Sequence, residues 1–207
     1  MNDKISILIV DDHAILRMGL ASLLGTRPEI EVSGDAAGGE AALRKYPKLQ
    51  PNVVIMDLVM PGMDGVEATR ALLERHPGAR ILILTTFGIS DSIARALDAG
   101  ALGVVMKNVS LAELLLAIRK TAAGERYVSP EIERILADDP PIQELSPRQG
   151  QILGLLGRGF SNVDIARSLG ISLDMVKEHV IALYAKLGAA NRTEAVTIAL
   201  RKHLLPT

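Results

Sequence analysis

The first 120 residues alternate between two kinds of segment. Short apolar runs rich in β-branched residues are separated by longer segments in which apolar residues recur at helical spacing. The short runs have the length and composition of strands that are buried on both faces. Strands that alternate with helices predict an α/β fold, with a mostly parallel sheet between two layers of helices. We expect five strands, at Ile5–Val10, Ile30–Val32, Val53–Met56, Ile81–Leu84 and Val104–Met106.

The pattern changes after residue 123. The stretch Asp138-Asp139-Pro140-Pro141 is polar and carries two prolines, which disfavour helix. It predicts a linker over residues 124–143, which can include a short helix at Glu131–Ala137. From Leu145 onward helical spacing dominates, and glycines and capping residues divide it into four helices. These are expected at about 146–156, 161–168, 172–187 and 191–203.

The two expected domains, residues 1–123 and 144–207, differ in charge. The chain of 207 residues has a net charge of −1. Residues 1–144 carry 15 Lys and Arg against 20 Asp and Glu, whereas residues 145–207 carry 8 against 4. An acidic first part is therefore joined to a basic helical module of the kind that can bind nucleic acid.

Three absences narrow the functional classes. Cysteine is absent, which excludes disulfides, thiolate metal sites and a cysteine nucleophile, and fits a reducing cytoplasm. The apolar runs are far shorter than the roughly 20 residues of a membrane span, and Ile5–Val10 is too short for a signal peptide. Aromatic residues are 2% of the chain, too few to bind single strands by base stacking. We expect a cytoplasmic protein with no membrane partner.

Charged and hydroxyl side chains stand at the carboxyl ends of four expected strands. In chain order they are Asp11 and Asp12, Asp57, Thr85 and Lys107. The ends of parallel strands meet at one edge of the sheet, where α/β proteins bind their ligands. A single aspartate there often caps the next helix, but three with a threonine and a lysine predict a site. Clustered carboxylates need a counter-charge, and Mg²⁺ is a hard cation that prefers oxygen ligands.

These residues lead to a hypothesis of phosphoryl chemistry. The two neighbouring aspartates Asp11 and Asp12 hold Mg²⁺ together with Asp57 and the backbone carbonyl of Val59. Asp57 is the nucleophile toward a phosphoryl group, as aspartates are in acyl-phosphate chemistry. A lysine and a threonine at the neighbouring strand ends, Lys107 and Thr85, neutralise the phosphoryl oxygens and donate a hydrogen bond to them.

Four motifs, in this order and spacing, resemble the receiver domain of two-component response regulators. They are Val10-Asp11-Asp12-His13, Met56 to Gly65, Leu84-Thr85-Thr86 and Met106-Lys107. The resemblance covers about residues 4–122. It implies a flavodoxin-like, doubly wound five-stranded parallel sheet with strand order 2-1-3-4-5. It also implies that a sensor histidine kinase phosphorylates Asp57, and that Thr85 rather than Thr86 is the matching threonine.

The chain departs from the receiver pattern near the expected site. The aromatic switch residue that usually stands three residues before the lysine is Val104, so a signal must travel through Thr85 and backbone shifts. Val59 and Phe87 flank the site with apolar side chains that cannot orient an attacking water, which predicts slow self-dephosphorylation. For His13 we expect a structural role at the start of the first helix.

The second and third helices of the basic module are joined by Gly170-Ile171, as in a helix-turn-helix whose second helix enters the major groove. Spacing alone favours an ordinary helical hairpin. Several short sequence motifs, however, together resemble the LuxR-type DNA-binding domain over about residues 144–203. With the receiver resemblance, the whole chain resembles the NarL/FixJ subfamily of response regulators. The motifs are Leu145–Arg148, Gly159–Asn162, Asp164–Ala166, Gly170–Ser172, Val176–Val180, Lys186–Gly188 and Asn191–Val196.

Candidate DNA contacts lie mainly on the third helix of this module. Lys177 is placed for guanine edges or a phosphate, and Glu178 for accepting a hydrogen bond from cytosine N4. Basic residues that could bind phosphates, or could simply be solvated charges, are Arg158, Arg167, Lys186 and Arg192. Where relatives carry polar residues this chain has Val163, Met175 and Ile181. Few polar contacts remain, which predicts a short site or one read partly by DNA shape.

The resemblance also implies how the two parts cooperate. The unphosphorylated receiver restrains the DNA-binding module, and phosphorylation frees it to form a homodimer on two half-sites of double-stranded DNA. An alternative is an aspartyl-phosphate phosphatase, which the apolar residues at 59 and 87 disfavour. Another is an adaptor that does not use the pocket, and failure of acetyl phosphate and Mg²⁺ to label Asp57 would indicate it. The favoured function is a transcriptional regulator and not an enzyme.

Overall fold

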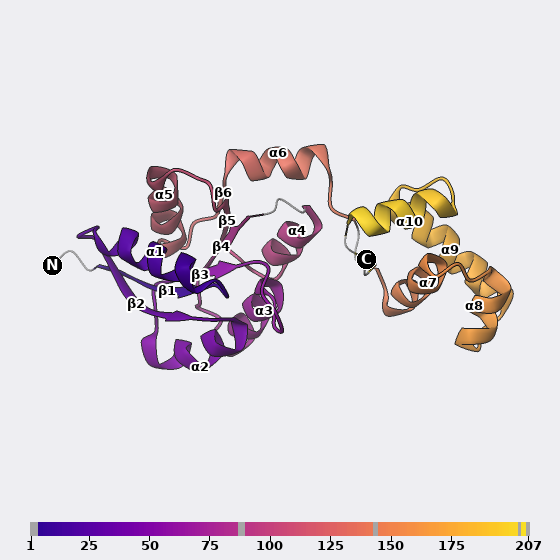
Figure 1. Ribbon diagram of the computed structural model, residues 1–207, viewed down its shortest axis with the longest axis horizontal. Coiled ribbons are helices and arrows are strands. Elements are labelled where there is room, and N and C mark those ends of the chain that lie inside the picture. The colour runs from indigo at the N-terminus through magenta and orange to yellow at the C-terminus, as the bar shows by residue number, and fades with distance from the viewer. Residues whose placement is uncertain (1–3, 87–89, 143–144, 203, 206–207) are drawn as a thin grey trace. The chain divides into compact units, whose positions relative to one another are not determined.

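The computed structural model describes residues 4–86, 90–142, 145–202 and 204–205 (Figure 1). The chain divides into two compact units, residues 1–140 and 141–207. Within the described residues, no helix has both the length and the apolar character needed to cross a bilayer.

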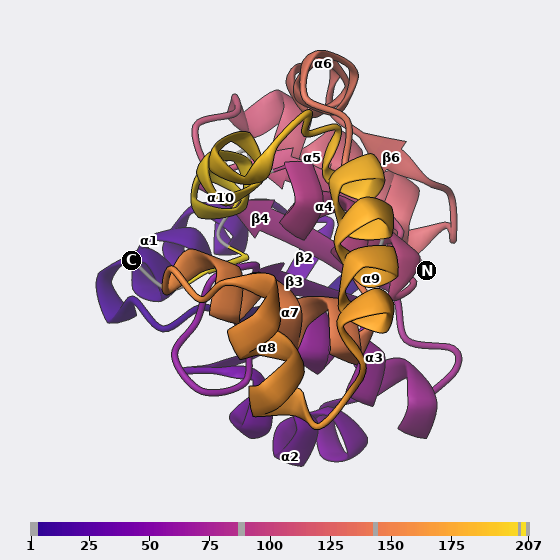
Figure 2. The same ribbon diagram turned by 90° about the vertical axis from the view of Figure 1, so that its right-hand side faces the viewer.

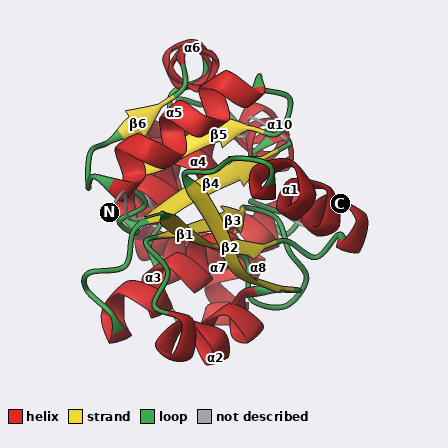
Figure 3. Ribbon diagram, turned by 90° about the vertical axis from the view of Figure 1, so that its left-hand side faces the viewer, coloured by secondary structure: helices red, strands yellow, loops and turns green. Residues whose placement is uncertain are grey.

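The first unit is built on a parallel sheet with strand order β2-β1-β3-β4-β5-β6 (Figure 3). All neighbouring strands run in the same direction. The expected order 2-1-3-4-5 is confirmed, but the expected count of five is wrong because a short sixth strand extends the sheet beyond β5. The strands are β1 (Ile5–Val10), β2 (Ile30–Ala36), β3 (Val53–Asp57), β4 (Ile81–Thr85), β5 (Gly103–Met106) and β6 (Tyr127–Val128).

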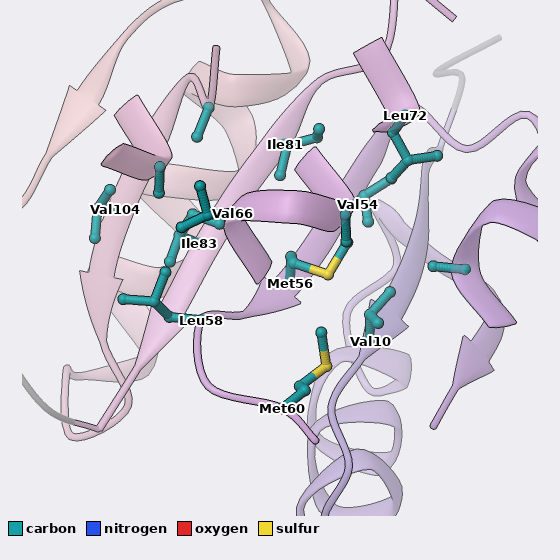
Figure 4. Close-up of a cluster of buried hydrophobic side chains, with 14 of the residues drawn as sticks. Val10, Val54, Met56, Leu58, Met60, Val66, Leu72, Ile81, Ile83 and Val104 are labelled. Atoms are coloured by element: carbon teal, nitrogen blue, oxygen red, sulfur yellow. The ribbon is translucent and has the colours of Figure 1, made fainter. Parts of the chain in front are cut away.

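Helices cover both faces of this sheet. On one face, α1 (Ala14–Gly25) and α5 (Leu111–Ala122) pack against side chains such as Ile55 and Leu82. The other face contacts α2 (Gly39–Leu49), α3 (Gly65–Arg75), α4 (Ser90–Asp98) and α6 (Pro130–Asp138). Successive residues of a strand point to opposite faces, so each central strand must be apolar throughout. Figure 4 shows the buried apolar side chains on this second face, which include Val10, Val54, Met56, Ile81 and Ile83.

The structure differs from the sequence expectation at the two edges of the sheet. β2 continues past Val32 to Ala36, through Ser33, Gly34 and Asp35, because an edge strand need not be apolar throughout. At the opposite edge, the segment expected as a linker over 124–143 contains β6, which was not predicted, and α6, which agrees with the short helix expected at Glu131–Ala137. β6 is only two residues long, which is too short for a periodicity to reveal it.

Helix α6 is fixed to the first unit by apolar and polar contacts. The hydroxyl of Ser129 caps its start by accepting from the N–H of Ile132, whose side chain is fully buried. At its other end, Oγ of Ser90, the first residue of α4, donates to Oδ2 of Asp139 at 2.8 Å. The segment up to Asp139 is therefore packed structure rather than a free connection.

The second unit consists, in its described residues, of α7 (Pro147–Gly157), α8 (Asn162–Leu169), α9 (Leu173–Leu187) and α10 (Arg192–Arg201) (Figure 2). Each helix begins after a residue whose side-chain oxygen accepts from a backbone N–H three positions later, and these caps are Ser146, Ser161, Ser172 and Asn191. The turn between α8 and α9 contains Gly170 at φ +65°, a left-handed conformation that favours glycine. The expected four-helix arrangement is confirmed.

Candidate functional site

Three strand ends bring one lysine and two aspartates into direct contact. Asp57 is the last residue of β3, while Asp11 and Lys107 directly follow β1 and β5. Nζ of Lys107 donates to Oδ2 of Asp11 at 2.7 Å and to Oδ2 of Asp57 at 2.8 Å. Residues that are far apart in sequence thus form the cluster that the strand pattern predicted.

Burial sets the electrostatics of this cluster. Asp11 and Asp57 are 1% and 4% exposed. Loss of solvent raises the pKa of Asp57 above its ordinary value, although the Lys107 ammonium acts in the opposite direction. For Lys107, burial alone would lower the pKa, but the hydrogen bonds and charges of Asp11 and Asp57 raise it. Two carboxylates therefore share one firmly protonated ammonium, and the site carries more negative than positive charge.

The acidic side of the cluster fits a hard divalent cation. Asp11, Asp12, His13 and Asp57 each offer one ligand atom, and these atoms lie within 4.8 Å of one another. Oδ1 of Asp12 is buried, and Nδ1 of His13 lies 2.8 Å from it. Several carboxylate oxygens this close together form an oxygen-rich donor set that suits Mg²⁺. The N–H of Val59 lies 3.5 Å from Oδ1 of Asp57, too long for a strong hydrogen bond, but it places this peptide unit beside the carboxylate.

Thr85 lies next to this cluster through strand register. It is the last residue of β4, is fully buried, and is paired with Met106 of β5. Its carbonyl accepts from the N–H of Lys107 at 2.7 Å. On the other side of Asp57, a Cβ at Gly65 would lie 2.3 Å from the carbonyl oxygen of Asp57, so only glycine lets α3 begin this close to the end of β3.

Two residues near the site were not predicted to contact it. The N–H of His13 donates to Oδ1 of Asp11 at 2.8 Å, and Nδ1 of His13 lies 2.8 Å from Oδ1 of Asp12. His13 also precedes α1 as its N-cap position, in line with the expected structural place. One turn later, Arg17 donates from its guanidinium to the carbonyl of Asp11 at 2.7 Å and to Oδ2 of Asp35 at 2.9 Å. His13 and Arg17 are four residues apart, which is one helical turn. This spacing was the sequence signal from which both contacts near the site could have been predicted. Phe87 lies outside the described residues.

In the second unit, Lys177 and Glu178 are exposed on α9. Their neighbours in the helix, Val176 and Val180, point into the core, so the two polar residues lie on the outer side. Nζ of Lys177 donates to Oδ1 of Asp174 at 2.9 Å, one turn earlier on the same surface. Exposure leaves both residues accessible to a ligand, and the contact with Asp174 is weak because it is solvated.

Two other predicted contacts donate to groups within the protein. Nη1 and Nη2 of Arg192 donate to the carbonyls of Phe160 and Leu156 at 2.7 and 2.6 Å. Nζ of Lys186 donates to Oε1 of buried Gln149 at 3.0 Å. These bonds connect α10 and α9 to α7, so both cations contribute to the packing of the second unit.

Arg158 and Arg167 are the more exposed cations. Nη1 of Arg167 lies 3.4 Å from Oδ1 of Asp164. Nε of Arg158 donates weakly to the carbonyl of Gly154 at 3.3 Å, and its guanidinium lies 5.7 Å from the ring centre of Phe160. Together with Ser168 they line a shallow surface hollow of about 490 Å³.

Comparison with known proteins places both units in described families. Residues 7–119 match the family "Response regulator receiver domain", and residues 143–199 match "Bacterial regulatory proteins, luxR family". The chain is 37% identical to the response regulator protein VraR of Staphylococcus aureus, over 97% of this chain and 99% of that protein.

Solved structures agree with these matches over nearly the full chain. The crystal structure of response regulator ChrA of a heme-sensing two-component system is 37% identical, with a TM-score of 0.59, covering 97% of this chain and 98% of that one. RcsB of Salmonella enterica serovar Typhimurium, bound to promoter P1flhDC in the presence of the phosphomimetic BeF3-, is 26% identical, with a TM-score of 0.70 and coverage of 97% and 100%. The chain belongs to the two-component response regulators that join a receiver domain to a LuxR-type helix-turn-helix domain, the arrangement of the NarL/FixJ subfamily.

Proposed function

We propose that the chain is a phosphorylation-dependent transcriptional regulator in which a sensor histidine kinase phosphorylates Asp57 and residues 144–207 bind double-stranded DNA. The observation that carries the proposal is the pair of hydrogen bonds from Lys107 to Asp11 and Asp57. It supplies a buried carboxylate together with the cation that a transferred phosphoryl group requires. RcsB, the relative described above as bound to a promoter with a phosphomimetic, supports the link between the two activities.

The transfer step follows from the cluster. A carboxylate oxygen of Asp57 attacks the phosphorus of a phosphohistidine, a P–O bond forms, and the P–N bond breaks. The imidazole leaves with the electron pair of that bond and takes up a proton. Lys107 neutralises the phosphoryl oxygens, and the Thr85 hydroxyl donates a hydrogen bond to them. Mg²⁺, when held by Asp11, Asp12, Asp57 and the carbonyl of Val59, supplies further charge neutralisation.

Phosphorylation adds about −1.5 to −2 charges to a cluster that is already acidic. Thr85 ends the neighbouring strand β4 and Lys107 donates directly to Asp57, so these two residues respond first. We infer that this biases the receiver between two arrangements, and that the phosphorylated form dimerises so that two helix-turn-helix units occupy two half-sites.

The same site predicts slow loss of the phosphoryl group. Val59 is exposed and apolar, so it cannot orient a water molecule for attack on phosphorus. The chain is therefore a phosphoryl acceptor with slow self-dephosphorylation rather than a turnover enzyme. A cytoplasmic location, where a sensor kinase and DNA are both accessible, belongs to this proposal.

The DNA contacts divide according to their present partners. Lys177 and Glu178 are candidates for base edges because they are exposed on α9. Arg158 and Arg167 are the better candidates for phosphates because they are exposed. Arg192 already donates two strong hydrogen bonds to carbonyls, and Lys186 donates one to Gln149. A phosphate would have to replace those bonds.

The test is labelling with acetyl phosphate and Mg²⁺, followed by mass spectrometry, light scattering and duplex-binding assays. The wild type is expected to gain one phosphoryl group, to dimerise and to bind duplex DNA more tightly. Asp57→Asn is expected to lose all three responses, whereas Asp98→Asn, an exposed carboxylate of α4, keeps them. If Asp57→Asn responds like the wild type, the proposed switch is wrong. An unlabelled wild type indicates an adaptor, repeated turnover indicates a phosphatase, and loss of label within seconds contradicts slow self-dephosphorylation.

A further inference from the structure

The outward face of α9 exposes apolar side chains. Ile181 is 70% exposed and Met175 is 46% exposed, and both lie away from the core residues of the same helix. Ala182 and Ala185 are exposed on this face as well. Most of the apolar surface of Ile181 is therefore in contact with water, which is unfavourable. A ligand with apolar groups could cover this surface and gain free energy by doing so.

The same face offers few groups for hydrogen bonding. Between Met175 and Ile181, the exposed polar side chains are Lys177 and Glu178, and Lys177 already contacts Asp174. Glu178 is an acceptor but not a donor when ionised, and its charge repels phosphates. The small side chains of Ala182 and Ala185 allow close approach of the helix backbone to a surface. This face is therefore suited to shape and apolar contact more than to polar recognition.

The major groove of DNA presents one apolar group at base edges, the 5-methyl group of thymine. Residues 145–207 carry 8 Lys and Arg against 4 Asp and Glu, which favours a polyanion over an apolar protein partner. The position of α9 as the second helix of a helix-turn-helix places its outward face in the groove. Met175 and Ile181 are six residues apart, or about 9 Å along the helix axis and about 120° around it, so they flank Glu178 on the outward side and both fit within one half-site.

We propose that α9 reads thymine through its apolar side chains, with Ile181 and Met175 packing against thymine 5-methyl groups in the major groove. These two residues then determine specificity, and Glu178 excludes sequences that place a phosphate or an acceptor near it. The inference rests on the proposed DNA-binding function, because it names the chemical feature of the duplex that this function recognises.

The first experiment selects bound duplexes from a random pool with the full chain, treated with acetyl phosphate and Mg²⁺. The selected half-site is expected to contain thymine at two or more fixed positions. Each thymine is then replaced by deoxyuridine, which removes only the 5-methyl group, and binding is measured by fluorescence anisotropy. At each contacted position the dissociation constant is expected to rise about fourfold, the factor that corresponds to roughly 0.8 kcal/mol for one buried methyl group.

The second experiment assigns each methyl group to a side chain. Ile181→Ala is expected to bind the thymine and deoxyuridine duplexes equally at one position, and Met175→Ala to do so at another. Val163→Ala, which shortens a 53% exposed apolar side chain on α8, is the matched control and keeps both discriminations. Because all three side chains are exposed, the variants are expected to fold, and far-UV circular dichroism with thermal unfolding checks this.

Two outcomes overturn the inference while leaving DNA binding intact. In one, a site is selected but every deoxyuridine duplex binds as tightly as its parent. In the other, Ile181→Ala and Met175→Ala both retain the full discrimination at every position. If no duplex is enriched at all, DNA binding itself fails and the thymine reading fails with it.

Discussion

The site at the edge of the sheet and the outward face of α9 treat charged and apolar groups in opposite ways. In the first, two buried carboxylates are in direct contact with a half-buried ammonium. In the second, charges lie in solvent and an isoleucine is left exposed. Buried charges must be compensated where they stand, so the first site is part of the fold's stability. Exposed residues carry no such constraint, so α9 can change its ligand preference without affecting folding.

The largest effect is expected from Lys107→Met. The variant keeps the volume of the side chain but leaves Asp11 and Asp57 buried without a cation, which lowers the free energy of unfolding by about 3 kcal/mol or more. Scanning calorimetry in the presence of EDTA measures the change in the transition of residues 1–140. Added Mg²⁺ is expected to restore part of the loss, because the ion supplies the missing positive charge.

Lys48→Met is the matched control, since Lys48 is exposed near the end of α2. Its unfolding is expected to change by less than about 0.5 kcal/mol. If Lys107→Met is no less stable than this control, the carboxylates of the site are not electrostatically coupled to the fold as we describe.

The contrast between the two regions also explains what the sequence could predict. Topology brings the ends of parallel strands together, so Asp11, Asp57 and Lys107 could be placed in contact from strand pattern alone. No such rule links a surface cation to its partner. Arg192 was expected to be a phosphate ligand or a solvated charge, yet it donates to two carbonyls near the end of α7, a tertiary contact that spacing along the chain does not contain.

The edges of the sheet were the harder part of the fold for a related reason. Central strands must be apolar on both faces, whereas β2 tolerates Ser33 and Asp35 at an edge and β6 needs only two residues. The first unit ends at Pro140, whereas we expected the first domain to end at residue 123 and a linker to follow. The two prolines gave no sign that α6, just before them, packs on the sheet, because that contact depends on Ile132 meeting a surface formed by distant strands.

Arg192→Ala tests whether a cation of the second unit contributes to folding stability, as Lys107 does in the first unit. Loss of two charge-assisted hydrogen bonds is expected to lower the stability of this unit by about 2–3 kcal/mol. For a unit of this size that corresponds to a fall of about 10 °C or more in the midpoint of its calorimetric transition. The salt dependence of DNA binding, measured below that midpoint, is expected to stay unchanged.

Arg167→Ala is the opposite case and serves as the comparison. Arg167 is exposed, so its removal is expected to leave the unfolding midpoint in place. If it contacts a phosphate, the slope of log affinity against log salt falls by about 0.9. If Arg192→Ala instead changes the salt slope of DNA binding and leaves the unfolding midpoint unchanged, Arg192 contacts DNA after all.

The smallest effect is expected from Gln149→Glu, which introduces into the second unit a buried charge pair like that of the first. Oε1 of Gln149 accepts from the N–H of Ser146 at 2.9 Å and from Nζ of Lys186 at 3.0 Å. A glutamate keeps both acceptor contacts and turns the second into an ion pair, for a gain of at most about 1 kcal/mol, or an increase of a few degrees in the midpoint.

The comparison for this variant is Gln151→Glu beside Arg148, an exposed pair on the same helix with a separation of 3.1 Å between Oε1 and Nη1. High salt is expected to abolish its smaller gain, because exposed charges are screened more than buried ones. If Gln149→Glu lowers the midpoint, the loss of hydration of the new carboxylate exceeds its attraction to Lys186. A single buried ion pair would then be unfavourable in this unit, and the buried charges at the edge of the sheet would be explained by phosphoryl transfer rather than by stability.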